Sequence, residues 1–408
     1  MTRDDAIALD AADPLARFRE AFDLPEGLIY LDGNSLGPPP KATLAKLADV
    51  AAREWGHDLI RSWNDNGWNA APLRVGAKIA RLIGAKPDEV AVADSTSVNL
   101  FKLAAGALSL RPGRTTILSE TGNFPTDLYI LQGLSDLLPD IALKAVEPAA
   151  VLASIDADTA VVVLTEVHYK SARRWDMVAL TAAAHARGAL ILWDLSHSAG
   201  AVVTDLNGCG ADLAVGCGYK YLNGGPGAPA YLFVAGRHQA AIRSPLTGWM
   251  GHAAPFAFGD HFRPAPGIRA QVTGTPSVLG LSALEAGVDL HLQADPAALE
   301  AKGLALADLF IDLVEARCAG FGLGVASESG ARRGLHVALT HPEGYAIVQA
   351  LISRGVIGDF RAPDVMRFGF APLFLSRADI WDAVEILRDI LAIRAWDTPA
   401  FRTRSAVT

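Results

Sequence analysis

The feature that most constrains the fold is the alternation of short apolar stretches with helix-like segments from about Glu89 onward. The expected strands are Val90–Ala93, Thr115–Leu118, Ile141–Val146, Ala160–Leu164, Leu190–Trp193, Leu213–Gly216 and Ala230–Val234. The helical patterns between them include Val98–Leu110, Pro125–Leu138 and Met177–Arg187. Apolar strands separated by helices predict an α/β fold with a mainly parallel sheet covered on both faces. Such sheets bind ligands beyond the carboxyl ends of their strands.

The length of 408 residues allows two or three domains. We expect an N-terminal arm and helix over residues 1–60 that belong to the small domain, a large domain over 61–285 and a smaller α/β C-terminal domain over 286–408. Helical spacing predicts one long helix over residues 41–59 and a long helical stretch from Ser277. Strands are expected at Leu335–Thr340 and Met366–Phe370, with helices over 343–354 and 377–391.

Composition excludes several classes of protein. The net charge of −8 argues against a nucleic-acid or anionic-membrane surface. Cys209, Cys217 and Cys318 have neither disulfide nor zinc spacing, and no His/Glu cluster has the spacing of a zinc protease. The N-terminus lacks the pattern of a signal peptide, and no apolar run is long enough to span a membrane. We therefore expect a cytoplasmic protein without metal, nucleic acid or membrane partners.

Small polar and aromatic residues follow the first two expected strands. Thr96 and Ser97 open a helix, where hydroxyl groups, backbone amides and the helix dipole can bind a phosphate. An ordinary N-cap is the alternative. Phe124 comes before a helix that starts with proline, so its ring could stack on a planar cofactor or simply staple the helix.

Charged residues follow two later strands. Asp194 directly ends a buried apolar strand, which is costly unless the carboxylate has a partner. Lys220 lies between two tyrosines and before a glycine-rich turn, a setting in which a lysine can form a Schiff base. The four signals together fit pyridoxal phosphate: hydroxyl groups for the phosphate, a ring for stacking, a carboxylate for the pyridine nitrogen and an amine for the aldehyde.

The chain also resembles a known family. The stretches LDGNSLG (31–37), NFPTDLY (123–129), WDLSHSAG (193–200), YKYLNGGPG (219–227), GWMGH (248–252) and RFGFAPL (367–373) are similar to those of kynureninases. These enzymes have the pyridoxal-phosphate-dependent fold type I, with a mainly parallel seven-stranded sheet in the large domain and a smaller α/β domain. The resemblance implies hydrolysis of L-kynurenine to anthranilate and L-alanine, a step in tryptophan degradation.

The resemblance also implies roles for individual residues. Lys220 would carry the cofactor and move protons, Asp194 would pair with its ring nitrogen, and Tyr219 is our candidate acid for protonation at Cβ. The remaining cofactor contacts implied are Thr96, Ser97, Phe124, Asp127, Thr165, His197 and Tyr219, with Trp249 and Thr275 reaching in from the second subunit of a homodimer. Arg367 would bind the substrate α-carboxylate, and Asn34, Ser35 and Trp63 would complete the substrate site.

Two further expectations concern specificity and alternatives. Trp63 and Thr275 stand where the animal enzymes place a histidine and an asparagine, so we expect 3-hydroxykynurenine to be the poorer substrate. Within the same fold, the alternative is a cysteine desulfurase or selenocysteine lyase, which needs a reactive cysteine. A cofactor-binding regulatory protein is the alternative outside the enzymes, but a catalytically dead relative would be expected to lose Lys220 or Asp194.

Overall fold

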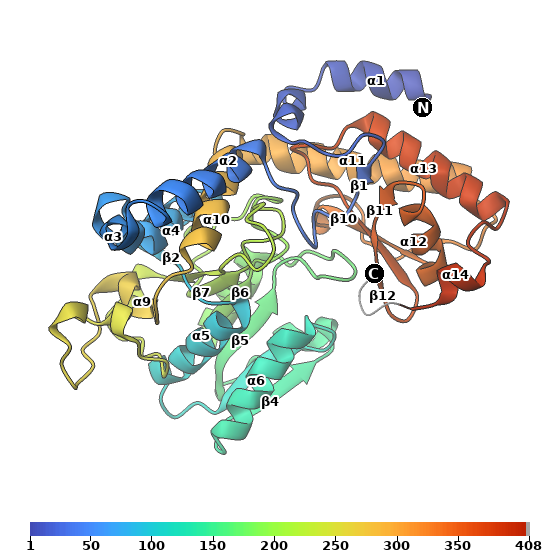
Figure 1. Cartoon of the computed structure of the whole chain (residues 1–408). Coiled ribbons are helices and arrows are strands. Elements are labelled where there is room, and N and C mark those ends of the chain that lie inside the picture. The colour runs from blue at the N-terminus through green and yellow to red at the C-terminus, as the bar shows by residue number, and fades with distance from the viewer. Residues whose placement is uncertain (405–408) are drawn as a thin grey trace.

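A seven-stranded sheet forms the centre of the larger part of the molecule in the computed structural model, which describes residues 1–404 (Figure 1). Its strands are β2 (Val90–Val92), β3 (Thr116–Glu120), β4 (Ala142–Val146), β5 (Thr159–Thr165), β6 (Leu190–Asp194), β7 (Leu213–Gly216) and β8 (Tyr231–Val234). They lie in the order β2-β8-β7-β6-β5-β3-β4. Only β8 runs antiparallel to its neighbours, so the mainly parallel sheet expected from the sequence is confirmed.

Helices cover both faces of this sheet. One face carries α5 (Thr96–Leu110) and α6 (Pro125–Leu137), and the other carries α4 (Ala71–Leu82), α8 (Met177–Ala186) and α10 (Val278–His291). Within β5, Val161 and Val163 pack toward α5 and α6, whereas Val162 packs toward the other helices. Because both faces are buried, the central strands are apolar throughout rather than alternating.

A second, four-stranded antiparallel sheet forms the smaller part of the molecule. Its strands are β9 (Gly324–Val325), β10 (His336–Thr340), β12 (Asp359–Arg361) and β13 (Val365–Gly369), in the order β12-β13-β10-β9. The helices α11 (Pro296–Arg317), α12 (Gly344–Ile352) and α13 (Arg377–Ala392) share its apolar core. The register places His336 opposite Gly369 and Ala338 opposite Arg367, so both pairs lie on one face of the sheet.

The N-terminal arm lies on this smaller part (Figure 1). Helix α1 (Arg3–Ala11) packs on α13, and Asp10 accepts hydrogen bonds from the backbone of that helix at Arg377 (2.8 Å). Strand β1 (Ile29–Tyr30) pairs in parallel with β11 (Val356–Ile357). Helix α2 (Lys41–Asp49) then packs on α10. The division of the chain after residues 60 and 285 stays a prediction.

Two expected helices differ from those observed. The helix expected over 41–59 ends as α2 at Asp49, continues as a π-helical turn to Trp55, and is broken by the left-handed backbone of Leu59 (φ 53°). The stretch from Ser277 divides into α10 and α11, because Pro296 cannot donate a backbone hydrogen bond and Asp295 caps the second helix. The remaining short helices are α3 (Ser62–Asp65), α7 (Val151–Ser154), α9 (Gly236–Gln239) and α14 (Pro399–Arg402).

Across residues 1–404, no helix combines the length and the apolar character needed to cross a bilayer.

Candidate active site

The polar residues singled out by the sequence come together beyond the carboxyl ends of the parallel strands. Thr165 and Asp194 end the neighbouring strands β5 and β6, where they lie opposite each other in register. Lys220 follows β7, the next strand in the sheet. Carboxyl ends of adjacent parallel strands meet at one edge, and this fixes the three side chains at one site.

The amine of Lys220 is buried in a defined environment. Its Nζ lies 3.0 Å from Nε2 of His197. It also lies 5.7 Å from the centroid of the Phe124 ring and 5.8 Å from that of Tyr219. Burial lowers the pKa of His197 well below its usual range, and the positive charge of Lys220 lowers it further. His197 is therefore a neutral imidazole whose Nε2 can accept a hydrogen bond from the amine.

The glycine-rich turn after Lys220 allows close backbone contacts. The Gly37 amide donates to the carbonyl of Tyr219 (2.9 Å), and a Cβ at Gly37 would lie 2.2 Å from the carbonyl oxygen of Lys220. A Cβ at Gly224 would lie 2.6 Å from the Gly218 carbonyl oxygen. Both glycines are thus required by the approach of backbone to backbone, and the N-terminal arm helps to hold the lysine loop.

Two buried carboxylates face the lysine. Oδ1 of Asp194 accepts hydrogen bonds from the backbone amide (2.8 Å) and hydroxyl (2.6 Å) of Ser196. The Thr165 hydroxyl contacts both Oδ2 of Asp127 (3.3 Å) and Oδ1 of Asn123 (2.6 Å). Burial raises the pKa of both carboxyls, and the charge of Asp194 raises that of Asp127 further, while Lys220 lowers both.

The charges of these buried side chains favour a cofactor that brings a positive charge. A single amine faces two buried carboxylates, and an unpaired buried carboxylate is costly. A protonated pyridine nitrogen at Asp194 would add the missing positive charge, and the Phe124 ring beside Lys220 offers a stacking surface. The side chains present therefore fit pyridoxal phosphate.

The start of α5 fits the phosphate group of such a cofactor. Thr96 and Ser97 are half-buried in the first turn of this 15-residue helix, after the N-cap Ser95. The turn is anchored by the fully buried Lys102, whose Nζ donates to Asp94 (2.7 Å) and to the Gln271 carbonyl (2.6 Å). Free backbone amides, the helix dipole and two hydroxyl groups make this end of α5 suitable for an anion.

Arg367 lies on β13 in a dense polar network. Nε donates to Oδ1 of Asp359 (2.7 Å), and Nη2 donates to Oδ2 of Asp359 and to the Ser35 hydroxyl (3.0 Å). Nη1 donates to the Tyr169 carbonyl (2.5 Å). Of the five N–H groups of the guanidinium, one on Nη1 has no partner within residues 1–404. A substrate carboxylate that took two hydrogen bonds would displace Ser35 or Tyr169.

Three of the sequence-predicted residues lie apart from the cluster around Lys220. Trp63 packs edge-to-face on Trp68, with ring centroids 5.8 Å apart. Trp249 is 43% exposed and packs on Phe256. Thr275 lines a cavity of about 240 Å³ together with Asp94, which comes just before the first turn of α5. Among the contacts of the described chain, none joins these three side chains to Lys220, and their roles stay predictions.

Sequence reasoning missed several residues of the site. Asp359 holds Arg367, Asn123 holds Thr165, and His336 lies with its ring centroid 5.4 Å from that of His197. Asn123 opens the NFPTDLY stretch and could have been found from its place before Phe124. His336 and Asp359 carry no local signal, because they reach the site only through the register of the second sheet.

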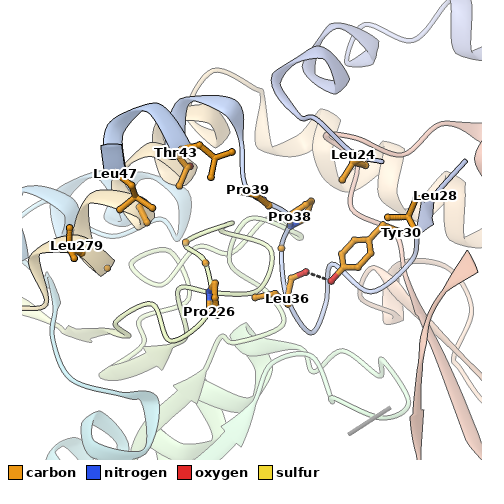
Figure 2. Close-up of a pocket in the computed structure, with 16 residues that line it drawn as sticks. Leu24, Leu28, Tyr30, Leu36, Pro38, Pro39, Thr43, Leu47, Pro226 and Leu279 are labelled. Carbon is orange, nitrogen blue, oxygen red and sulfur yellow. Dashed lines mark hydrogen bonds between the residues drawn. The ribbon is translucent and has the colours of Figure 1, made fainter. Parts of the chain in front are cut away.

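Figure 2 shows an apolar cavity, of about 570 Å³, whose lining includes none of the polar side chains around Lys220. It is lined by the N-terminal arm, α2, α10 and the turn after Lys220, including Leu24, Leu28, Tyr30, Leu47, Gly225, Pro226 and Leu279. The Tyr30 hydroxyl donates to the Leu36 carbonyl (2.8 Å) at its edge. The polar side chains thus lie at the strand ends and not in this apolar cavity.

Residues 1–404 contain no group of three or more His, Cys, Asp or Glu side chains that could hold a metal ion.

The fold and the site together define the class, the fold type I architecture of pyridoxal-phosphate-dependent enzymes. Solved structures with this fold include the apo cysteine desulfurase of Thermococcus onnurineus NA1, with a TM-score of 0.78 at 16% identity over 92% of this chain and 98% of that one. The cystine C-S lyase C-DES, solved with its product cysteine persulfide, has a TM-score of 0.76 at 15% identity over 89% of this chain and 98% of that one.

Sequence relatives identify the family within that class. The chain is 52% identical over its whole length to a kynureninase of Burkholderia mallei (strain SAVP1) and 51% identical to one of Pseudomonas fluorescens, each matched over its full length. Residues 299–387 match the kynureninase C-terminal domain. The chain belongs to the kynureninase family.

Proposed function

We propose that this protein hydrolyses the Cβ–Cγ bond of L-kynurenine, giving anthranilate and L-alanine, with pyridoxal phosphate as its cofactor. The observation that carries the proposal is the buried Lys220 amine, 3.0 Å from neutral His197 and facing the carboxylates of Asp127 and Asp194. Membership of the kynureninase family specifies the substrate. Breakdown of tryptophan, in the cytoplasm, is the setting that this reaction fits, and the three free thiols are in keeping with a reducing compartment.

The cofactor supplies an electron sink for negative charge that develops on the substrate carbons. The protein's own groups bind and move protons around it. Thr96 and Ser97 would hold the phosphate, and Asp194, oriented by Ser196, would keep the ring nitrogen protonated. Lys220 would take the Cα proton, with His197 beside its amine as proton partner. Arg367 would bind the α-carboxylate.

Tyr219 would donate the proton that completes alanine. Burial raises the pKa of its phenol above the usual range, so the hydroxyl stays protonated at neutral pH and can act as an acid. Tyr219 and Lys220 are consecutive residues of one loop, and the ring centroid of Tyr219 lies 5.8 Å from the Lys220 amine.

A turnover assay tests this function directly. Purified protein loaded with pyridoxal phosphate is given L-kynurenine, and anthranilate and alanine are measured by fluorescence and chromatography. We expect both products from wild type and from Lys144→Ala, a control at an exposed lysine on β4, but neither from Lys220→Ala. Cleavage by Lys220→Ala at the wild-type rate would refute the assignment of the lysine.

We further propose a homodimer whose sites are shared between subunits, with Trp249 and Thr275 acting on the partner's cofactor. Trp249 is exposed on a loop with Phe256 (65% exposed) and Phe258 (77% exposed), an apolar surface that a second copy would cover. Mixing and refolding Lys220→Ala with Trp249→Ala tests the sharing. If the sites are shared, about half of the dimers are mixed, and each mixed dimer has one intact site out of two. The mixture would then recover about a quarter of wild-type activity, whereas unshared sites would recover none.

We also propose that unsubstituted kynurenine is preferred over 3-hydroxykynurenine. The support is the bulk of Trp63, whose indole offers no acceptor for a ring hydroxyl. The measurement is the ratio of kcat/KM for the two substrates, and equal values would contradict the proposal.

The desulfurase alternative lacks its nucleophile. Cys217 and Cys318 are buried, Cys209 is half-buried, and burial raises the pKa of all three thiols. A reactive cysteine needs a lowered pKa and access to substrate, and none of these thiols has both. Sulfide release from cysteine is therefore not expected.

A further inference from the structure

Four buried or partly buried polar side chains near Lys220 have atoms that lack hydrogen-bond partners in the described chain. Both polar atoms of Asn34 and both ring nitrogens of His336 are unpaired, although each side chain is fully buried. Nδ1 of His197 and Oδ1 of Asp32 are unpaired as well. Buried polar groups are normally hydrogen-bonded to protein or to ordered water, so a group of unpaired atoms indicates a ligand.

The register of the second sheet brings these side chains together around Gly369. Gly369 lies opposite His336 and forms a bridge with Asp32. The Asn34 carboxamide occupies the space above the glycine, since a Cβ there would lie 2.0 Å from its Oδ1. The Asn34 carboxamide thus lies over the position of β13 that is opposite His336 on β10.

The same group reaches the catalytic lysine. The His336 and His197 rings have centroids 5.4 Å apart, and Nε2 of His197 lies 3.0 Å from Nζ of Lys220. Side chains with unpaired polar atoms therefore extend from Asn34, over β13, through His336 and His197 to the Lys220 amine.

The chemistry of the group fits water better than a larger ligand. Asn34 offers two donors and an acceptor, and a neutral histidine offers one of each. Burial lowers the pKa of His336 well below its usual range, and the charge of Arg367 lowers it further, so the ring is neutral. Both side chains are fully buried, so a partner for their polar atoms has to be small and has to both donate and accept hydrogen bonds.

We propose that Asn34 and His336 bind a water molecule and hold it for the hydrolysis at Lys220. This inference rests on the proposed function. In that reaction the hydroxyl of water bonds to the substrate carbonyl carbon as the Cβ–Cγ bond breaks, giving the carboxyl group of anthranilate. The electron pair of the broken bond stays with Cβ, which takes up a proton to become the methyl group of alanine.

Two reactions of the loaded enzyme separate this role from a structural one. Exchange of the Cα hydrogen of L-alanine with deuterated solvent requires Lys220 but no attack by water on a carbonyl. Hydrolysis of L-kynurenine requires both. We compare wild type with His336→Leu, which removes the polar ring, and with His336→Gln, which keeps a donor and an acceptor. His341→Gln is the matched control, because His341 follows the other end of β10 and packs on Trp396.

We expect His336→Leu to lower kcat for kynurenine about tenfold, the effect of one lost hydrogen bond, while alanine exchange stays within about twofold. His336→Gln should recover most of the hydrolysis, and His341→Gln should leave both reactions unchanged. An equal loss of both reactions in His336→Leu, or a loss of neither, would overturn the proposal.

A crystal structure of the loaded wild-type enzyme provides a readout that does not depend on turnover. We expect ordered water within hydrogen-bond distance of both Asn34 and His336, and the lack of density there would overturn the proposal even if the variants lost activity. Failure of the proposed function is distinct: wild type would then exchange alanine but leave kynurenine uncleaved.

Discussion

The ion pair between Asp359 and Arg367, the proposed carboxylate-binding residue, allows a direct measurement of how much its charges stabilise the protein. Both side chains are 2% exposed, and two N–H groups of the guanidinium bond to the two carboxylate oxygens. Asp359 also accepts from the Ser35 hydroxyl (2.7 Å) and pairs with Arg361 (2.8 Å). One carboxylate thus balances two arginines, so Asp359→Asn keeps the shape but removes the charge on which both depend.

The size of the effect follows from the burial. Removing one partner of a buried pair costs about 3–5 kcal/mol, because the other charge stays behind without compensation. Arg361 is partly exposed, and Asp32 remains nearby as a second carboxylate, so we place the loss at the lower end, about 3 kcal/mol. With a urea m-value of about 3 kcal/mol/M, the unfolding midpoint would fall by about 1 M.

The dependence of this loss on pH has a definite sign. Burial alone would raise the pKa of Asp359, but the hydrogen bonds and charge of Arg367 bring it below the ordinary value of 3.8. A lowered folded-state pKa gives stability that is present above the unfolded pKa and is lost as the pH falls through the folded one. The difference between wild type and Asp359→Asn should therefore be largest near neutral pH and shrink in acid.

Urea unfolding followed by tryptophan fluorescence measures the effect, with Asp364→Asn as the control. Asp364 lies in the same β12–β13 connection, and its carboxylate forms no ion pair with any residue from 1 to 404. A loss below about 1 kcal/mol in Asp359→Asn, or an equal loss in the control, would refute the reasoning. Replacing the pair by Asp359→Leu with Arg367→Met should restore most of the stability but none of the activity.

Three further predictions concern the same site. Burial and the charge of Asp359 raise the pKa of Asp32 from 3.8 to about 7. The free energy of unfolding of the wild type should therefore fall as the pH rises through that window. Unfolding measured from pH 4 to 8 should show that Asp32→Asn removes this pH dependence. Tyr219→Phe should lower kcat about 100-fold, as expected for loss of a catalytic acid, with full turnover as the contrary result. Gly37→Ala would place a Cβ 2.2 Å from the Lys220 carbonyl oxygen. We expect kcat to fall about 100-fold while the absorbance of the bound cofactor is retained. Wild-type kinetics in this variant would show that the close contact is not needed.

The sequence predicted the parallel sheet well because its signals are local. β6 is a fully buried apolar strand that ends in a carboxylate, and the expected limits differ from the observed ones by one residue. Lys220 and Asp194 then follow from the rule that ligands bind at the carboxyl ends of strands. The start of α11 was missed, although Asp295 followed by Pro296 is a typical N-cap and first helical position.

The second half of the site could not be predicted in this way. His336 and Asp359 gain their positions from antiparallel pairing with β13, and a register shift of one residue would turn each of them to the other face. Nothing near Arg367 in the sequence indicates that Ser35 and Tyr169 share its guanidinium. The left-handed Leu59 likewise breaks a helix whose apolar spacing continues through it.

The pairing of the N-terminal arm with the second sheet has a consequence for synthesis of the protein. Ser35 bonds to Asp359, which lies 324 residues later in the chain, and β1 has its partner in β11. At a synthesis rate of about 5–20 residues per second, the arm leaves the ribosome roughly 16 to 65 seconds before that partner exists. The parallel sheet around Lys220 is complete earlier, so a nascent or truncated chain would carry Lys220, the proposed cofactor lysine, while Asp359 and Arg367 are still missing.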